Sequence, residues 1–258
     1  MNALARKLVS LTWFSLLALW TLAAQAAQPI LIPAPPQIAA KSYILMDANS
    51  GYIIAENNSH EKLPPASLTK LMTAYVVEYE IAKGQLSPED EVRISVKAWK
   101  TGGSKMFVRE GTRVKLRDLM KGIIIQSGND ASVAVAEHLA GSEDAFADIM
   151  NQHAQLLGMK DSHFANATGL PHKDHYTTAY DLALLARAII TRFPEQYKIY
   201  SEKYFTYNNI RQPNRNLLLW RDKSVDGLKT GHTAEAGYCL VASAVRDNMR
   251  LISVVMGA

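Results

Sequence analysis

The sequence predicts an α/β protein of the α+β kind, with one antiparallel sheet and an all-helical subdomain. Two observations favour this fold class. Hairpin signals occur close to both ends of the chain, and the long segment between them has the periodicity of amphipathic helices. We therefore expect N- and C-terminal strands to form one sheet flanked by helices. The functional site is expected where this sheet meets the helical subdomain.

Residues 1–26 are predicted to be a signal peptide. Arg6 and Lys7 precede an apolar run over 8–22, and Ala24-Gln-Ala26 has the small-x-small pattern that signal peptidases cut. Ser10, Thr12 and Ser15 interrupt the run and no basic flank follows it, which favours a cleaved leader over a membrane anchor. The protein is therefore expected to be exported.

The charge of the chain excludes some classes of partner. Removing Arg6 and Lys7 from the 28 basic residues leaves 26 against 24 acidic ones, a formal charge of +2. This is too small to indicate nucleic-acid binding. The one cysteine, Cys239, lies in an apolar run and is interpreted as a core residue, since a lone cysteine forms no internal disulfide.

The first predicted strands follow a proline-rich lead-in. Residues 27–40 contain four prolines and are expected to be extended, and residues 41–258 are expected to form the catalytic domain. Within it, residues 43–47 and 52–56 flank Asn49-Ser-Gly51, a hairpin signal. Near the other end, residues 237–245 and 249–256 flank Asp247-Asn248 in the same way.

The middle of the chain is predicted to be helical. An apolar stripe with helical spacing runs from Leu68 to Tyr79, and Lys83-Gly84 ends it. Further helices are expected at 116–125, 131–140, 143–157 and 178–190. The last of these begins at Thr177 or Thr178 with Asp181 in its first turn, which is a capping-box pattern.

Three short motifs occur in a fixed order along the chain: Ser67-Leu-Thr-Lys70, Ser127-Gly-Asn129 and Lys229-Thr-Gly231. They supply a nucleophile with a nearby amine, a second hydroxyl with an amide, and a cation on a strand. These groups are needed to acylate a serine with a substrate that ends in a carboxylate. The set therefore predicts a serine acyl-transfer enzyme.

Context selects between duplicate motifs, because Ser59-His-Glu-Lys62 and Lys100-Thr-Gly102 also match. Ser67 opens the amphipathic helix, where backbone N–H groups and the positive helix end favour developing negative charge. Lys70 lies one turn further on the same face. Ser59 lies in a polar stretch before two prolines, where we expect nothing to fix the pair, and Lys100 lies in a glycine-broken loop.

Each motif alone has an ordinary structural interpretation. Ser67 is a candidate N-cap, Ser127-Gly-Asn129 a turn before the next helix, and Lys229-Thr-Gly231 a strand end. All three in this order, each at an element boundary, favour the catalytic interpretation. His172, Asp174 and His175 are interpreted as a polar loop, because no accompanying metal-binding motif is present, and we expect neither a metal nor a cofactor.

From about residue 40 to the last residue the chain resembles the serine-type D-alanyl-D-alanine carboxypeptidases of bacteria, which are low-molecular-mass penicillin-binding proteins of peptidase family S11. Beyond the three motifs, the resemblance rests on Ser42-Tyr-Ile-Leu, Gln126 to Asp130, Arg211-Gln-Pro-Asn-Arg-Asn216, Val225 to Thr233, and Ala236-Gly-Tyr238. It implies a β-lactamase/transpeptidase-like fold. It also implies a periplasmic enzyme of peptidoglycan biosynthesis that influences cell shape, associated with the inner membrane where a full-length form carries a C-terminal anchor.

The resemblance also implies roles for individual residues. Ser67 would attack the carbonyl between two terminal D-alanines of a stem pentapeptide, with a neutral Lys70 as the base. Ser127 would pass a proton to the leaving amine, and Asn129 would hold Lys70 or the substrate amide.

Binding roles are implied in the same way. The backbone N–H groups of Ser67 and His232 would form the oxyanion hole. Lys229, Thr230 and Gly231 would receive the substrate carboxylate, with Arg215 and His232 in support. β-Lactams would acylate the same serine and inhibit the enzyme.

Three alternatives share these motifs. A class A β-lactamase carries a deacylating glutamate between the second and third motifs, whereas no glutamate occurs here between Glu143 and Glu195. A DD-endopeptidase would cut peptidoglycan cross-links with the same site. A non-catalytic penicillin-binding sensor would keep the fold without the serine or lysine chemistry.

The resemblance also implies a longer protein. The family usually continues into a further helix on the sheet, often a second all-β domain, and a C-terminal amphipathic anchor. We therefore expect residues 41–258 to be a catalytic domain truncated at its C-terminus, with an exposed apolar face. Membrane association is expected only through a C-terminal segment that this sequence lacks.

Overall fold

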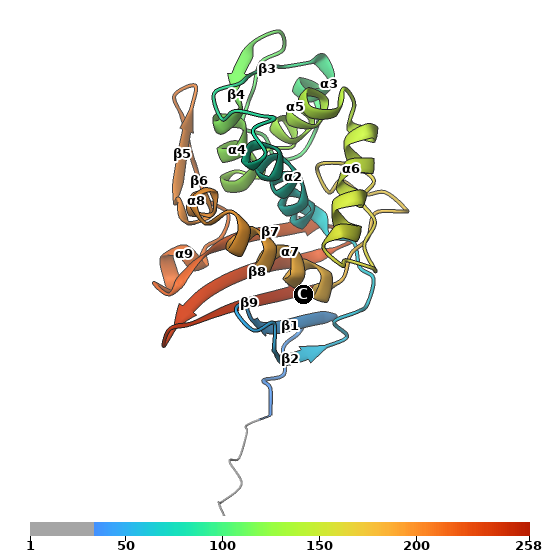
Figure 1. Ribbon diagram of the computed structural model, residues 1–258, viewed down its shortest axis with the longest axis vertical. Helices are drawn as coiled ribbons and strands as arrows, with labels where there is room; N and C mark the ends of the chain where they lie inside the picture. The colour runs from blue at the N-terminus through green and yellow to red at the C-terminus, as the bar shows by residue number, and fades with distance from the viewer. Residues whose placement is uncertain (1–33) are drawn as a thin grey trace, which may run out of the picture. The chain divides into compact units, whose positions relative to one another are not determined.

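Strands from both ends of the chain form one five-stranded antiparallel sheet, in the order β2-β1-β9-β8-β7 (Figure 1). Its members are β1 (Ser42–Asp47), β2 (Ile53–Asn57), β7 (Val225–Thr233), β8 (Gly237–Arg246) and β9 (Met249–Met256). The N-terminal β1 pairs with the C-terminal β9, so the predicted fold class is confirmed. β7 lies at one edge of the sheet.

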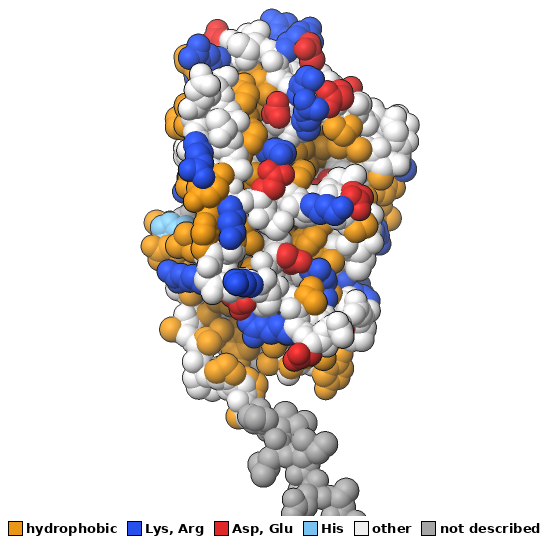
Figure 2. All heavy atoms as spheres, turned by 90° about the vertical axis from the view of Figure 1, so that its left-hand side faces the viewer, with side chains coloured by type: hydrophobic (Ala, Val, Ile, Leu, Met, Phe, Trp, Pro, Cys, Tyr) orange, Lys and Arg blue, Asp and Glu red, His pale blue; other side chains and the backbone are white. Residues whose placement is uncertain are grey.

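The structure, a computed structural model, describes residues 34–258, and residues 38–258 form one unit. The predicted signal peptide and residues 27–33 of the lead-in therefore lie outside the described residues. Within 34–258, no helix is both long and apolar enough to cross a membrane. Acidic and basic side chains are interspersed on the face shown in Figure 2.

The two predicted hairpins form, and their turns explain why. Asp47 Oδ1 accepts the backbone N–H groups of Asn49 and Ser50 at 2.8 and 2.7 Å. In the second hairpin Asp247 and Asn248 both have positive φ, at 48° and 63°. This is the conformation that two-residue turns with the right twist require, and Asp and Asn adopt it at little cost.

The helical region packs around α2 (Lys70–Ala82), which lies centrally in Figure 1. The other long helices are α4 (Leu116–Ile125), α5 (Asn129–Ala140), α6 (Glu143–Leu156) and α7 (Ala179–Arg192). α7 lies on the sheet against β9 and β1. Nine consecutive residues of α2, from Lys70 to Glu78, are buried, so this helix has no solvent face in its first two turns.

Several short elements complete the fold. They are η2 (Ala66–Thr69), α3 (Val96–Lys100), α8 (Pro194–Tyr197), η3 (Lys198–Ser201), α9 (Leu218–Arg221), and two small sheets made of β3 (Glu91–Arg93) with β4 (Arg113–Lys115) and β5 (Tyr204–Tyr207) with β6 (Ile210–Pro213). Apart from η2, which overlaps the start of a predicted helix, the sequence analysis missed them because three to five residues are too few to show a period.

Two helix starts differ from expectation. The helix predicted from Leu68 begins instead as the 3₁₀ turn η2, and its α-helical part starts at Lys70. The helix predicted at 131 already starts at Asn129, so the last residue of the second motif is the first residue of α5 and Gly128 is its N-cap.

The predicted capping box before α7 is half formed. Thr178 Oγ1 accepts the N–H of Asp181 at 3.0 Å. The Asp181 carboxylate does not return the bond. It accepts from the Asp161 N–H at 3.0 Å and the Ser162 hydroxyl at 2.7 Å, and so ties another segment to this helix.

The two faces of the sheet differ in burial. Ile44, Met46, Val241, Ile252 and Val254 are buried beneath the helices. Apolar side chains on the opposite face, on β1, β8 and β9, are only partly covered: Tyr43, Leu45, Leu240, Leu251 and Val255.

Cys239 is 4 % exposed, and burial raises the pKa of its thiol.

Candidate active site

Ser67 lies in η2, between the sheet edge and the first turn of α2. The residue before it, Ala66, has φ +47°, a left-handed conformation that is rare for a residue with a Cβ. The edge strand β7 passes close by, since a Cβ on Gly231 would lie 3.2 Å from the Ser67 nitrogen and 3.1 Å from the Pro65 oxygen. A Cβ at this position would crowd the serine backbone, so glycine suits the close approach of β7.

The Lys70 amine is buried beside the Ser67 hydroxyl. Its Nζ lies 3.1 Å from Ser67 Oγ, and it donates to Asn129 Oδ1 at 2.7 Å and to the Thr168 carbonyl at 2.5 Å. A neutral amine has two N–H groups and one lone pair. Two donations to Asn129 and Thr168 therefore leave the lone pair for the Ser67 O–H, which is the arrangement of a base with its nucleophile.

The surroundings of Lys70 favour this neutral form. The side chain is 1 % exposed, and burial lowers its pKa well below the ordinary lysine value. The positive charges of Lys229 and Arg215 lower the pKa further, whereas Asp130 opposes them. Desolvation and like charge thus act in the same direction at this amine.

Asn129 connects Lys70 to a loop on the other side of the site. Its Nδ2 donates to the Gly102 carbonyl at 2.7 Å, and its backbone N–H donates to Ser104 O at 2.7 Å. A Cβ on Gly103 would lie 2.6 Å from Asn129 Nδ2, so the loop packs directly on the amide. The Lys100-Thr-Gly102 duplicate thus contributes a backbone carbonyl to the site, while Lys100 itself is exposed.

Ser127 has the left-handed φ of +65°, and its hydroxyl is buried without a hydrogen-bond partner among the described residues. Asp130, two residues after the turn, fixes the facing loop: its carboxylate accepts from the N–H groups of Met106, Phe107 and Val108 at 2.9 to 3.2 Å. Sequence analysis assigned no role to Asp130, although it follows the second motif directly.

Lys229 lies on β7 and is 2 % exposed. Burial, together with the charge of Arg215, lowers its pKa to about 7. Its Nζ donates to the Thr230 carbonyl at 2.9 Å.

Arg215 is exposed and donates from Nε to the Gln126 carbonyl at 3.2 Å, which places its charge beside the second motif. The His232 side chain is exposed and stacks near Tyr238, with ring centroids 4.3 Å apart.

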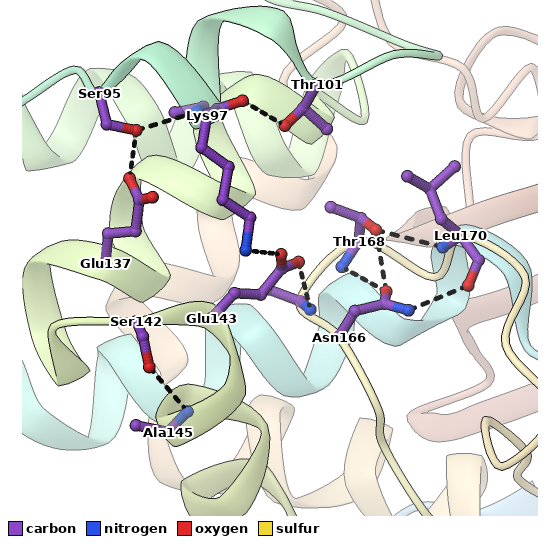
Figure 3. A network of polar contacts seen from close by, with 12 residues as sticks. Ser95, Lys97, Thr101, Glu137, Ser142, Glu143, Ala145, Asn166, Thr168 and Leu170 are labelled. Atoms are coloured by element: carbon purple, nitrogen blue, oxygen red, sulfur yellow. Dashed lines mark hydrogen bonds and ion pairs between the residues drawn. The ribbon is translucent and has the colours of Figure 1, made fainter.

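The loop that carries the Thr168 carbonyl is held by side chains that sequence analysis missed (Figure 3). Asn166 Oδ1 accepts from the Thr168 N–H, the Thr168 hydroxyl and the Gly169 N–H at 3.1, 2.9 and 2.7 Å. Glu143 accepts the Ala167 N–H at 3.2 Å and pairs with Lys97 at 2.9 Å. No residue-type signal marks a backbone carbonyl, so only the fold reveals this contact with Lys70.

The predicted site residues therefore lie around one place. Ser67, Lys70 and Asn129 are in direct contact, Gly231 packs on the Ser67 backbone, and Lys229 and Arg215 act electrostatically on the Lys70 amine. Thr230 lies between Lys229 and Gly231 in the chain, and Ser127 precedes Asn129 by two residues. Within residues 34–258, no cluster of three metal-ligating side chains is present.

An α+β fold with a buried lysine against a serine at the junction of sheet and helices is typical of enzymes that acylate that serine. Comparison with known families agrees with this class. Residues 30–258 match the peptidase S11 family model, described as D-alanyl-D-alanine carboxypeptidase. The chain belongs to this family, so the resemblance seen in the sequence is confirmed.

Individual relatives are similar over most of this chain. The D-alanyl-D-alanine carboxypeptidase DacD of Escherichia coli strain K12 is 50% identical over 233 residues, which are 88% of this chain and 60% of the relative. The chain thus spans about 60% of the length of the curated relatives that it matches first.

Two solved structures share the fold. Penicillin binding protein 5 from Haemophilus influenzae superposes with a TM-score of 0.85 at 49% identity, covering 88% of this chain and 67% of that one. Penicillin-binding protein D2 from Listeria monocytogenes in its ampicillin-bound form superposes with a TM-score of 0.80 at 30% identity, covering 88% and 92%.

Proposed function

We propose that this chain is the catalytic domain of an exported, periplasmic serine DD-carboxypeptidase that removes the terminal D-alanine from peptidoglycan stem pentapeptides. The observation that carries the proposal is the Lys70 amine, which is buried, donates to Asn129 and Thr168, and lies 3.1 Å from Ser67 Oγ. The names of the relatives support the choice of substrate.

In the proposed acylation, Lys70 Nζ takes the Ser67 proton as Oγ attacks the carbonyl carbon of the penultimate D-alanine. The negative oxygen that forms is stabilised by the N–H groups of Ser67 and His232. Collapse of the intermediate breaks the C–N bond. The proton passes from Lys70 through Ser127 to the leaving amine, so that D-alanine departs and an ester remains on Ser67.

The substrate carboxylate is proposed to bind Lys229 and Thr230, with Arg215 and His232 nearby and Gly231 keeping the strand close. An approaching carboxylate would restore the charge of Lys229, because an opposite charge raises a lysine pKa. Water then cleaves the ester and releases a tetrapeptide. β-Lactams, which also present a carboxylate, would acylate Ser67 in the same way.

The rival lactamase activity needs a carboxylate to activate the deacylating water. Among the described residues, the hydrogen-bond partners of Lys70 are a hydroxyl, an amide and a backbone carbonyl. Glu143 is already engaged by Ala167 and Lys97. We therefore propose that penicillin forms a long-lived ester on Ser67.

The test is release of D-alanine from a diacetyl-Lys-D-Ala-D-Ala peptide, compared with cleavage of a cross-linked muropeptide dimer. The proposal expects release from the peptide, and stoichiometric, slowly hydrolysed labelling by fluorescent penicillin. Preferential cleavage of the dimer would indicate an endopeptidase. Turnover of penicillin at tens per second would indicate a lactamase, and labelling without release of D-alanine would indicate a sensor.

A further inference from the structure

His175 is a buried titratable residue that the proposed reaction does not use. It is 4 % exposed, and neighbouring bridges fix its backbone: Tyr176 pairs with His163, and Thr177 pairs with Leu63. The imidazole lies edge-on to Phe164, with ring centroids 5.8 Å apart. It thus occupies a fixed place beneath the segment that leads into Ser67.

The two ring nitrogens of His175 have different partners. Ala165 N–H, which is only a donor, lies 3.3 Å from Nδ1, so Nδ1 accepts and carries no proton. Nε2 then carries the proton and donates to Thr69 Oγ1 at 2.8 Å. The Thr69 hydroxyl in turn donates to the Ala66 carbonyl at 2.8 Å. The hydrogen bonds from Ala165 to His175, from His175 to Thr69 and from Thr69 to Ala66 thus form one series in which each group donates to the next. This series requires the neutral Nε2–H tautomer of His175.

Electrostatics support this neutral form. Burial lowers the pKa of His175 to about 4, and positive charge on His163 and His172 lowers it as well. A proton on Nδ1 would face the Ala165 N–H, donor against donor.

The last bond of this series acts on the nucleophile through the peptide plane. The carbonyl of Ala66 and the N–H of Ser67 belong to one planar unit and point in opposite directions. The carbonyl faces Thr69 and Gly169, where a Cβ would lie 1.8 Å from Ala66 O. The Ser67 nitrogen faces β7, 3.2 Å from the place of a Cβ on Gly231.

This orientation is not one that Ala66 adopts freely, because its φ of +47° is strained for a residue with a Cβ. We infer that His175 is a positioning residue: through Thr69 it holds the Ala66 carbonyl, and thereby aims the Ser67 N–H at the developing oxyanion. The inference rests on the proposed function, in which that N–H is one of the two oxyanion donors.

The test measures the second-order rate constant of acylation by fluorescent penicillin, with thermal unfolding recorded for every variant. His175→Leu removes the ring donor, and Thr69→Val removes the hydroxyl at nearly constant volume. Loss of a well-placed oxyanion donor lowers rates by about 10² to 10³, so a misaimed donor should cost about 10- to 100-fold. His175→Gln, which can present an N–H near the position of Nε2, should recover the rate to within about threefold of wild type.

The double variant His175→Leu with Thr69→Val separates a relay from general loosening. Residues acting in one series are not additive, so the double variant should be no slower than the slower single variant. His172→Gln, in the same loop but exposed, is the matched control and should acylate like wild type. Should His175→Leu fail to fold, Thr69→Val tests the same series.

The ring itself provides a readout apart from activity. The ¹⁵N spectrum of the wild-type imidazole should show a neutral ring protonated on Nε2 at pH 7. A charged ring or the Nδ1–H tautomer would overturn the inference, as would folded His175→Leu and Thr69→Val variants that acylate like wild type, or effects that multiply in the double variant. Failure of the wild type itself to be labelled would instead overturn the proposed function.

Discussion

Ser59 and Lys62 have the same spacing as Ser67 and Lys70, and the two pairs lie close together in the chain. Their environments differ. The Lys62 side chain is 51% exposed and its Nζ lies 3.5 Å from Asp161, whereas Lys70 is 1 % exposed and contacts Ser67, Asn129 and Thr168.

Ser59 differs from the expectation that nothing fixes it, because its side chain is buried and hydrogen-bonded. It is 4 % exposed, and its hydroxyl donates to the Glu56 carboxylate, not to Lys62. Fixing a serine is therefore not enough. A reactive pair also needs an amine whose ammonium form is disfavoured, which at Lys70 follows from desolvation and from the charge of Lys229.

The comparison between the two pairs is tested most strongly by removing each serine. Ser67→Ala should abolish penicillin labelling and lower D-alanine release by about 10⁴-fold or more, since nothing else supplies the attacking oxygen. Ser59→Ala should keep both activities. Labelling that persists in Ser67→Ala and disappears in Ser59→Ala would reverse the assignment.

Removing the amines should have the next largest effect. Lys70→Met should lower the acylation rate by about 10² to 10⁴, the usual contribution of a general base. Lys70→Arg should not restore the rate, because a guanidinium stays protonated. The control Lys62→Met removes an exposed ion pair with Asp161 and a cation–π contact with the Tyr176 ring, and it should leave the rate unchanged.

The pH dependence distinguishes the two buried lysines. Below its pKa of about 7, Lys229 is charged and can bind a carboxylate, so kcat/KM should fall as the pH rises above that value. Lys70 must lose its proton, so its titration gives the acid limb of the same profile. Lys229→Arg keeps its charge and should move the alkaline limb upward, whereas Lys229→Ala should lower kcat/KM about 10- to 100-fold. An unchanged alkaline limb in Lys229→Arg would exclude Lys229 as its source.

The smallest expected effect is at the loop that presents the Thr168 carbonyl. Asn166→Ala removes one oxygen that accepts three hydrogen bonds, and it should lower the free energy of unfolding by about 1 to 3 kcal/mol and the acylation rate several-fold. Urea unfolding and penicillin labelling measure the two effects. The exposed Asn57, beside the unreactive pair, serves as control as Asn57→Ala. If Asn166→Ala had the stability and acylation rate of the wild type, the hydrogen bonds of Asn166 would not be needed to hold the Thr168 carbonyl against Lys70.

The sequence analysis succeeded where local pattern and chemistry agree. Alternation and turn residues predicted both hairpins, and helical periodicity predicted the long helices to within about two residues. The choice of Ser67 over Ser59 rested on the helix that follows. Family comparison confirms the fold and the resemblance, while the roles of the individual site residues remain proposals.

Other parts of the site leave no local signal. Thr168 contacts Lys70 through a backbone carbonyl, which every residue has. The left-handed Ala66 is held by Thr69, and Thr69 by His175, a partner distant in sequence. The short strands β3 to β6 are set by pairing rather than by their own alternation. Such features depend on contacts made only after folding.

The central claim is that the Lys70 amine is neutral beside the Ser67 hydroxyl, and NMR titration of ¹³Cε-labelled lysines tests it most directly. The resonance assigned by its loss in Lys70→Arg should titrate well below the ordinary lysine value of 10.5. Titration of this resonance at 10.5 would contradict the account, because the amine would then be an ammonium at neutral pH and no base for the serine.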